Sequence, residues 1–300
     1  MSDPFEQTGR TAPLIRRERT GLLAFAVPNL DEPYFAELTT LLVGRAGRQG
    51  IAILIQQTDG DHEREIDVAN GVGLPPTDGL IHIPRSLTVG DLTRRTSPGP
   101  LVLLGEHIQV SPFTHVTIDN AKATSAATRH LFDAGCTRIA YIGPRNARPS
   151  DAADRRYTGY VEALTELGLE HRRELVVPVD AFTPDEGFHR TERLISSAAR
   201  FDGIVCSNDS VAMGALAACA AAGITVPDDV AVIGIDNVRA SQFTVPSLTS
   251  VAPDDEALVD SALTEIERQI ATPPGANLPV RHISVDTRIA ARASTRRPRS

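Results

Sequence analysis

Two polar pairs stand at the ends of two apolar runs in the second half of the chain. Asn208 and Asp209 follow the run IVCS, and Asp236 and Asn237 follow the run VAVIGI. Short apolar runs of this kind are typical of parallel strands that are buried on both faces. In an open α/β sheet, ligands bind beyond the carboxyl ends of the strands. The pattern therefore predicts a hydrogen-bonding rim that recognises a small polar molecule.

Each of these residues also has a structural alternative, because Asp and Asn favour turns and helix caps. Asp209 is placed to cap the helix expected from Val211, which leaves Asn208 as the expected ligand contact. Asp236 is expected to accept hydroxyl groups of a ligand or to pair with Arg156 across a cleft. The alternative for Asp236 is a cap or a turn.

Aromatic and basic side chains supply the other groups that a polar ligand needs. Tyr34 and Phe35 are adjacent aromatic residues behind the run LLAFAV, in a chain with only 4% aromatic residues. A flat ring can cover the apolar face of a sugar or a base, although either ring can instead belong to the core. Arg156 offers a rigid fork of donors for hydroxyl pairs or a carboxylate. Its alternative is a solvated arginine beside Arg155.

The sequence contains no recognised catalytic motif. A phosphate-binding GxxxxGK[ST] loop, a GxSxG turn, an HExxH helix and a GxGxxG turn after the first strand are all missing. The histidines are scattered without ligand spacing, and no acidic pair has the context of a catalytic dyad. The three cysteines lack CxxC spacing, which indicates buried free thiols. We therefore expect a protein that is not an enzyme and that carries no metal or cofactor.

The elements that must position these residues alternate between strand and helix. Such alternation predicts mainly parallel sheets with helices on both faces, an α/β fold. Between residues 61 and 77 we expect only a short helix, because two glycines and two prolines oppose a longer one. We expect strands at 22–27, 51–55, 79–83, 100–104, 116–118, 138–142, 175–179, 203–207 and 230–235, and further helices at 34–47, 121–134, 157–167, 183–199 and 211–222.

Length and charge limit the class of protein. Three hundred residues with 41% hydrophobic residues suit about two domains. The formal net charge of −8 argues against a cationic nucleic-acid binder. The first twenty residues have no apolar segment of a secretion signal, and no apolar run is long enough to span a membrane. These features predict a cytoplasmic protein.

Several phrases of the chain closely resemble the effector domain of the lactose-repressor and galactose-repressor (LacI/GalR) family. They are TGLLAFAVPNLDEPYFAELTTLLVGRAGRQGIAILI, IDNAKATSAATRHLFDAGCTRIAYIG, SNDSVAMGAL, AAGITVPDDVAVIGIDN and PSLTSV. The resemblance implies a periplasmic-binding-protein-like fold, with two doubly wound lobes joined by a hinge that the chain crosses three times. The implied limits are a basic tail or linker at 1–19, a first lobe at 20–118 plus 254–283, a second lobe at 119–253 plus 284–296, and a tail at 297–300.

The resemblance also assigns expected roles to single residues. Arg156, followed by Gly159, matches the effector-binding arginine of the family phrase R-x-x-G-[FYW]. Phe182 stands where the family places an aromatic wall, and Glu106 matches a position that is often acidic and faces the ligand. Asp119 opens the crossing to the second lobe, where it acts in the hinge or in the pocket. Gly60 departs from the family at a position able to carry a further basic contact.

The expected function is that of a ligand-sensing and dimerisation domain of a transcriptional repressor. A sugar or related metabolite would bind between the lobes and control operator binding through a helix-turn-helix that is not recognisable in this sequence. The resemblance implies a homodimer, for which the apolar residues of 38–43 are candidates, although they can equally be core. The alternatives are a solute-binding protein of a sugar transporter and an enzyme on the same fold.

Overall fold

A computed structural model describes residues 19–105, 108, 112–144, 152–273, 276 and 278–296. Three sequence predictions concern residues outside this part of the chain. One is the helix-turn-helix expected to be missing from the first residues, together with most of the tail at 1–19. The second is the tail at 297–300, and the third is the ligand contact expected of Glu106. Among the described helices, none has the length and apolar character needed to cross a bilayer.

The first sheet has six strands, all parallel, in the order β11-β5-β4-β3-β1-β2. Side chains of β1 alternate between two cores: Leu23, Phe25 and Val27 pack on one face, while Ala24 and Ala26 pack on the other. Burial on both faces explains why this strand is apolar throughout. The strands are β1 (Leu22–Val27), β2 (Ala52–Gln57), β3 (Gly79–His82), β4 (Leu101–Leu104), β5 (Thr114–Ile118) and β11 (His282–Val285).

The second sheet also has six strands, in the order β12-β10-β9-β8-β6-β7. All neighbours are parallel except β12, which runs antiparallel to β10. Each strand expected from the sequence is present among β1 to β9, with ends within two residues of the prediction. The strands are β6 (Ile139–Ile142), β7 (Val176–Val177), β8 (Gly203–Cys206), β9 (Ala231–Ile235), β10 (Thr249–Pro253) and β12 (Thr287–Ala290).

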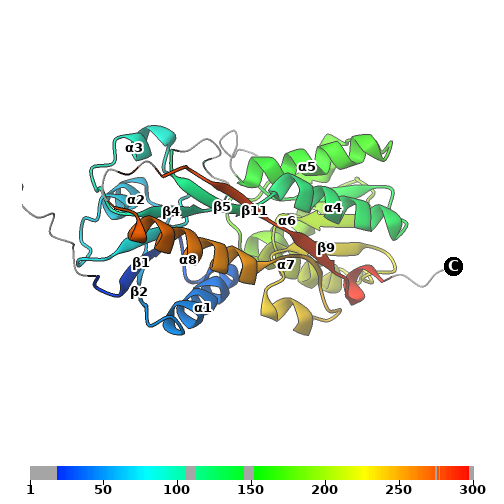
Figure 1. Cartoon of the computed structure of the whole chain (residues 1–300). Helices are drawn as coiled ribbons and strands as arrows, with labels where there is room; N and C mark the ends of the chain where they lie inside the picture. Colours follow the sequence, from blue (N-terminus) through cyan, green and yellow to red (C-terminus); the bar gives the residue numbers. More distant parts are fainter. Residues whose placement is uncertain are drawn as a thin grey trace, which may run out of the picture.

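Helices cover both sheets (Figure 1). Four differences from the expected helices stand out. Helix α5 begins five residues before Tyr157, α7 begins two residues before Val211, and neither α3 nor the long helix α8 was expected. The helices are α1 (Pro33–Gly47), α2 (His62–Ala69), α3 (Val89–Thr93), α4 (Asn120–Asp133), α5 (Ala152–Glu166), α6 (Pro184–Ser196), α7 (Asp209–Ala221) and α8 (Asp255–Ala271), with 3-10 turns η1 (Arg173–Leu175), η2 (Arg239–Phe243) and η3 (Ala293–Thr295).

The chain passes between the two sheets three times. It leaves the first sheet after β5, returns after β10 through α8, and leaves again between β11 and β12. Figure 1 shows the resulting pair of lobes, one with α1, α2, α3 and α8 and the other with α4 to α7. The predicted fold of two mainly parallel, helix-covered sheets is confirmed. The residue limits expected for the lobes stay a prediction.

Glycines allow two helix pairs in the second lobe to pack very closely. A Cβ atom at Gly159 of α5 would overlap the backbone of Ala121 at the start of α4. A Cβ at Gly187 of α6 would overlap the backbone of Val211 in α7, and one at Gly214 of α7 would overlap the backbone of Pro184 in α6. The close approach of α5 to α4 brings Arg156, one turn before Gly159, next to Asn120.

Replacing Gly159 with Ala should therefore destabilise the protein. The added methyl group has no space at the α4–α5 crossing, and overpacking of this kind costs about 1–3 kcal/mol. Urea unfolding of the two proteins would measure the difference.

Gly44→Ala is the matched control, because Gly44 lies in α1 with open space around its Cβ position. Alanine is the better helix former there, and the variant should be more stable by roughly 0.5–1 kcal/mol. Equal stability changes in the two variants would show that the close crossing has no energetic role.

Candidate functional site

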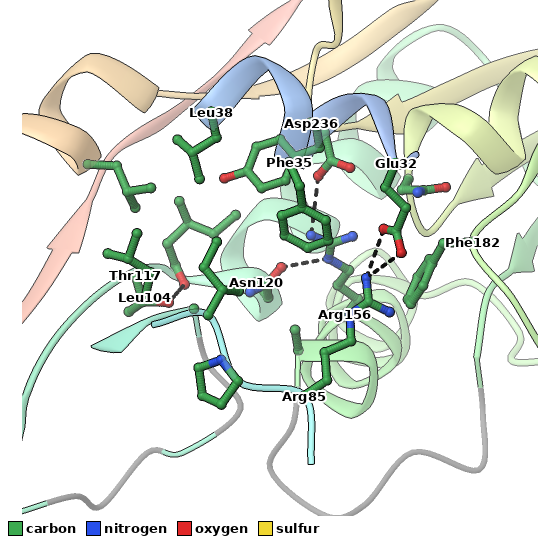
Figure 2. Close-up of a pocket in the computed structure, with 18 residues that line it drawn as sticks. Glu32, Phe35, Leu38, Arg85, Leu104, Thr117, Asn120, Arg156, Phe182 and Asp236 are labelled. Atoms are coloured by element: carbon green, nitrogen blue, oxygen red, sulfur yellow. Dashed lines mark hydrogen bonds and ion pairs between the residues drawn. The ribbon is translucent and has the colours of Figure 1, made fainter. Parts of the chain in front are cut away.

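A cavity of about 200 Å³ lies at the carboxyl ends of strands from both sheets. This volume is below the roughly 300–1,000 Å³ typical of drug-sized ligand sites, so the cavity suits a small metabolite. Figure 2 shows charged and aromatic side chains converging on it. Six of the residues predicted from the sequence line the cavity: Tyr34, Phe35, Arg156, Phe182, Asn208 and Asp236.

The guanidinium group of Arg156 connects three elements of the second lobe. Its Nε donates to Asn120 Oδ1 at 2.6 Å, and its Nη1 donates to the carbonyl oxygen of Ser207. Its Nη2 donates to Asp236 Oδ1 at 3.3 Å. The side chains of Arg156 and Asp236 are only 12% and 8% exposed, so this is a buried ion pair. Breaking such a pair on one side leaves an uncompensated buried charge.

Asp236 follows β9 in an unusual backbone conformation, with φ of 103°, and the next residue, Asn237, has φ of 53°. Positive φ values are uncommon for residues other than glycine. Two hydrogen bonds from the backbone hold the turn: Asp236 N–H donates to the carbonyl of Val251, and Asn237 N–H donates to Ser250 Oγ. Burial raises the pKa of Asp236 to about 6, against the opposing effect of Arg156. The carboxylate is therefore ionised at neutral pH and available as an acceptor.

The sequence predicted Asp209 as the cap of α7 and Asn208 as a ligand contact, and the prediction of the cap was wrong. Asn208 is the N-cap of α7, where its Oδ1 accepts from the N–H of Val211 at 2.9 Å, and it also lines the cavity. Asp209 is the first residue of α7 and is fully buried. Its carboxylate accepts hydrogen bonds from the N–H of Val238 and the hydroxyl of Ser250. The helix starts earlier than expected, which moves the cap from Asp209 to Asn208.

One other predicted residue, Asp119, is described by the structure but does not belong to the cavity lining. Asp119 is the N-cap of α4, and its Oδ1 accepts from Lys122 N–H at 3.0 Å. The neighbouring Asn120 lines the cavity and bonds Arg156 instead. Asp119 precedes the first helical residue, a position where Asp is favoured because it satisfies a free N–H. Glu106 lies outside the described residues.

Sequence reasoning missed a second ion pair in the cavity, between Glu32 and Arg85. Nη2 of Arg85 donates to both carboxylate oxygens of Glu32 at 2.8 Å. Arg85 follows β3 and Glu32 follows β1, so both lie beyond the carboxyl ends of strands. Asn208 and Asp236 were predicted from the same kind of position. Gly60, where the family resemblance allows a basic contact, lies beside Arg85, with its Cβ position 3.6 Å from the Arg85 Cβ.

Aromatic rings and aliphatic side chains complete the cavity. The guanidinium carbon of Arg85 lies 5.3 Å from the ring centroid of Phe35 and 5.3 Å from that of Phe182. The rings of Tyr34 and Phe35 pack edge to face, with 5.5 Å between their centroids. The aliphatic part of the lining comes mainly from the first lobe: Leu38, Ile83, Pro84, Leu104, Ile118 and Leu258. Among the described residues, no group of three or more His, Cys, Asp or Glu side chains is arranged to hold a metal ion.

This architecture and sequence match known regulators. The periplasmic binding protein-like domain family matches residues 128–295. The HTH-type transcriptional repressor PurR of Pectobacterium atrosepticum is 30% identical over 257 residues, which are 84% of this chain and 73% of that protein.

Solved structures agree with this match. A protein of Sanguibacter keddieii assigned to the LacI family of transcriptional regulators is 35% identical, with a TM-score of 0.85 over 92% of this chain and 99% of that one. A complex of the transcriptional regulator CelR with cellobiose is 26% identical, with a TM-score of 0.77 over 92% of this chain and 85% of that one. The chain therefore belongs to the LacI family of transcriptional regulators and contains a periplasmic-binding-protein-like domain.

Proposed function

We propose that this chain is the ligand-sensing and dimerisation part of a cytoplasmic transcriptional repressor, with a sugar-like metabolite as its effector. The observation that carries the proposal is the Arg156–Asp236 pair, which stands in a cavity bounded by both lobes. A guanidinium donates to hydroxyl oxygens, and a carboxylate accepts from hydroxyl hydrogens. The two groups together suit neighbouring hydroxyls of a polyol.

The remaining lining supports the same class of ligand. A sugar ring has an apolar face as well as hydroxyls, and Phe35 and Phe182 offer flat apolar surfaces for it. Asn208 and Asn120 add amide groups at the polar side of the cavity. The CelR–cellobiose complex, which has the same fold, gives a precedent for a sugar ligand.

Control of DNA binding follows from the position of the cavity between two lobes. The proposed switch has two relative arrangements of the lobes. A ligand that contacts both lobes shifts the equilibrium between these arrangements only if it binds one of them more tightly than the other. Couplings of about 1–3 kcal/mol are typical of such switches. In the proposed repressor, a homodimer transmits the change to operator DNA through a helix-turn-helix.

A panel of sugars, polyols and nucleosides screened by thermal unfolding tests the proposal. A ligand present at about 100 times its dissociation constant should stabilise the protein by about 2.7 kcal/mol. The identified ligand should then change operator binding in a gel-shift assay with the repressor. Stabilisation by none of the compounds, or a ligand that is chemically converted, would contradict the proposed function.

Arg156→Lys should weaken binding of the metabolite found in this screen. Lysine keeps the positive charge but cannot form the three-way set of hydrogen bonds to Asn120, Ser207 and Asp236. Loss of a hydrogen bond to a charged group costs about 1.5–3 kcal/mol, which corresponds to a roughly ten- to hundredfold higher dissociation constant. Isothermal titration calorimetry measures the change.

Arg155→Lys is the matched control, because Arg155 is the adjacent arginine of α5 and does not line the cavity. Its affinity should equal that of the unmodified protein. Equal affinities of the native protein and the two variants would show that Arg156 does not contribute to ligand binding.

Binding of an uncharged metabolite should also depend on pH. The Asp236 carboxylate is the stronger hydroxyl acceptor when ionised, and its pKa is raised to about 6 by burial. Affinity should therefore be constant well above pH 6 and fall as the pH drops below it, by up to roughly tenfold per pH unit. Calorimetry across this range, repeated with the Asp236→Asn variant, measures the effect. A fall of the same size in the variant as in the native chain would exclude Asp236 as the cause.

A further inference from the structure

The backbone around Arg85 is held in place by a buried carboxylate. Glu65 of α2 is fully buried, and its two oxygens accept from the N–H groups of Arg85, Ser86 and Leu87 and from the hydroxyl of Ser86. These four hydrogen bonds anchor the loop that follows β3. The direction in which Arg85 enters the cavity is therefore set by Glu65.

The side chain of Arg85 is 34% exposed and also has partners in the cavity. Its guanidinium lies between the rings of Phe35 and Phe182, one from each lobe, and it is paired with both oxygens of Glu32 (Figure 2). The side chain of Glu32 is 21% exposed, and Glu32 forms no capping hydrogen bond at the start of α1. The carboxylate of Glu32 is thus not used to cap the helix, and it neutralises Arg85 instead.

The described charged residues of the cavity form two matched pairs, Glu32 with Arg85 and Asp236 with Arg156. Further carboxyl groups lie close behind them. Burial, and then the charge of Asp236, raise the pKa of Asp209 well above its usual value, and the same two causes raise the pKa of Asp255 to about 7. These raised pKa values mean that negative charge is disfavoured in this part of the protein.

We infer that the Glu32–Arg85 pair selects the charge of the ligand: while Glu32 neutralises Arg85, the cavity takes an uncharged polyhydroxylated molecule and excludes acidic or phosphorylated counterparts. The inference rests on the proposed function, because it names the charge class of the proposed effector. Hydroxyl groups of a neutral ligand can accept from the guanidinium and donate to the carboxylate of the same pair.

An anion has no such option. It must displace Glu32 or Asp236 from its arginine, and the displaced carboxylate would then stay in the same small cavity without a partner. Separation is strongly unfavourable for the buried Asp236–Arg156 pair, and it is also unfavourable for the partly exposed Glu32–Arg85 pair, at a smaller cost. Removal of the Glu32 charge should reverse this preference, because Arg85 would then present an unpaired guanidinium between two aromatic rings, ready to bind an oxyanion.

Inorganic sulfate tests the inference without knowledge of the effector, since it keeps its double negative charge throughout the neutral range. Sulfate binding is measured by calorimetry with the native protein, Glu32→Gln and Asp31→Asn. Asp31→Asn removes the same charge one residue away, at an exposed position outside the cavity lining. Glu32→Gln should bind sulfate at least roughly tenfold more tightly than the other two proteins, as expected for one charged hydrogen bond gained.

A double variant, Glu32→Gln with Arg85→Gln, should lose this gain, because Arg85 is the group that Glu32 releases. Sulfate binding that is equally tight in the native protein, in Asp31→Asn or in the double variant would overturn the inference. If circular dichroism shows that Glu32→Gln is unfolded, Glu32→Ser replaces it, since serine at this N-cap position favours the helix.

The test separates this inference from the proposed function. A gain of sulfate binding in Glu32→Gln, with no metabolite binding to the native protein, would support the charge selection and refute the sugar effector. A metabolite that binds the native protein, without a gain of sulfate binding in the variant, would refute the charge selection alone.

Discussion

The buried guanidinium of Arg156 is the interaction on which the polar half of the cavity depends. It joins the start of α4 at Asn120, the end of β8 at Ser207 and the end of β9 at Asp236. A buried charge is tolerated only when it is paired and hydrogen bonded. The three elements must therefore meet at one point. The close α4–α5 crossing at Gly159 makes this meeting possible.

The two lobes contribute different chemistry to the cavity. Both lobes supply hydrogen-bonding groups, the second lobe through the network around Arg156 and the first lobe through the Glu32–Arg85 pair, while most of the aliphatic wall comes from the first lobe. Arg85 touches an aromatic ring on each side, Phe35 from the first lobe and Phe182 from the second. A molecule with hydroxyls and an apolar face would satisfy both walls only when the lobes enclose it, and in the proposed repressor this requirement would couple binding to lobe movement.

The site also carries features that oppose stability. Asp236 combines a positive φ with a carboxyl whose pKa burial raises, and Asp209 lies fully buried beside it. A raised pKa means that the ionised form is less stable in the folded protein than in water. Such costs are tolerated at functional sites when the surrounding structure holds the residues in place. Here the hydrogen bonds from Val238 and Ser250 to Asp209 provide that support.

The sequence alone determined the fold class and part of the site. Apolar runs predict β1 to β9 because strands buried on both faces must be apolar, and the strand-end rule found Asn208 and Asp236 because carboxyl ends of parallel strands share one edge. The sequence offered a pair between Arg156 and Asp236 as one of several possibilities, and only the tertiary structure decided the partners. Arg156 and Asp236 are 80 positions apart, and Arg85 and Glu32 are 53 apart. Local patterns carry no information on such distances, so the roles of Glu32, Arg85 and Asn120 emerged only when the folded chain brought them together. The Asn208 cap is a local contact, and the structure decided there between two adjacent residues that both favour helix caps.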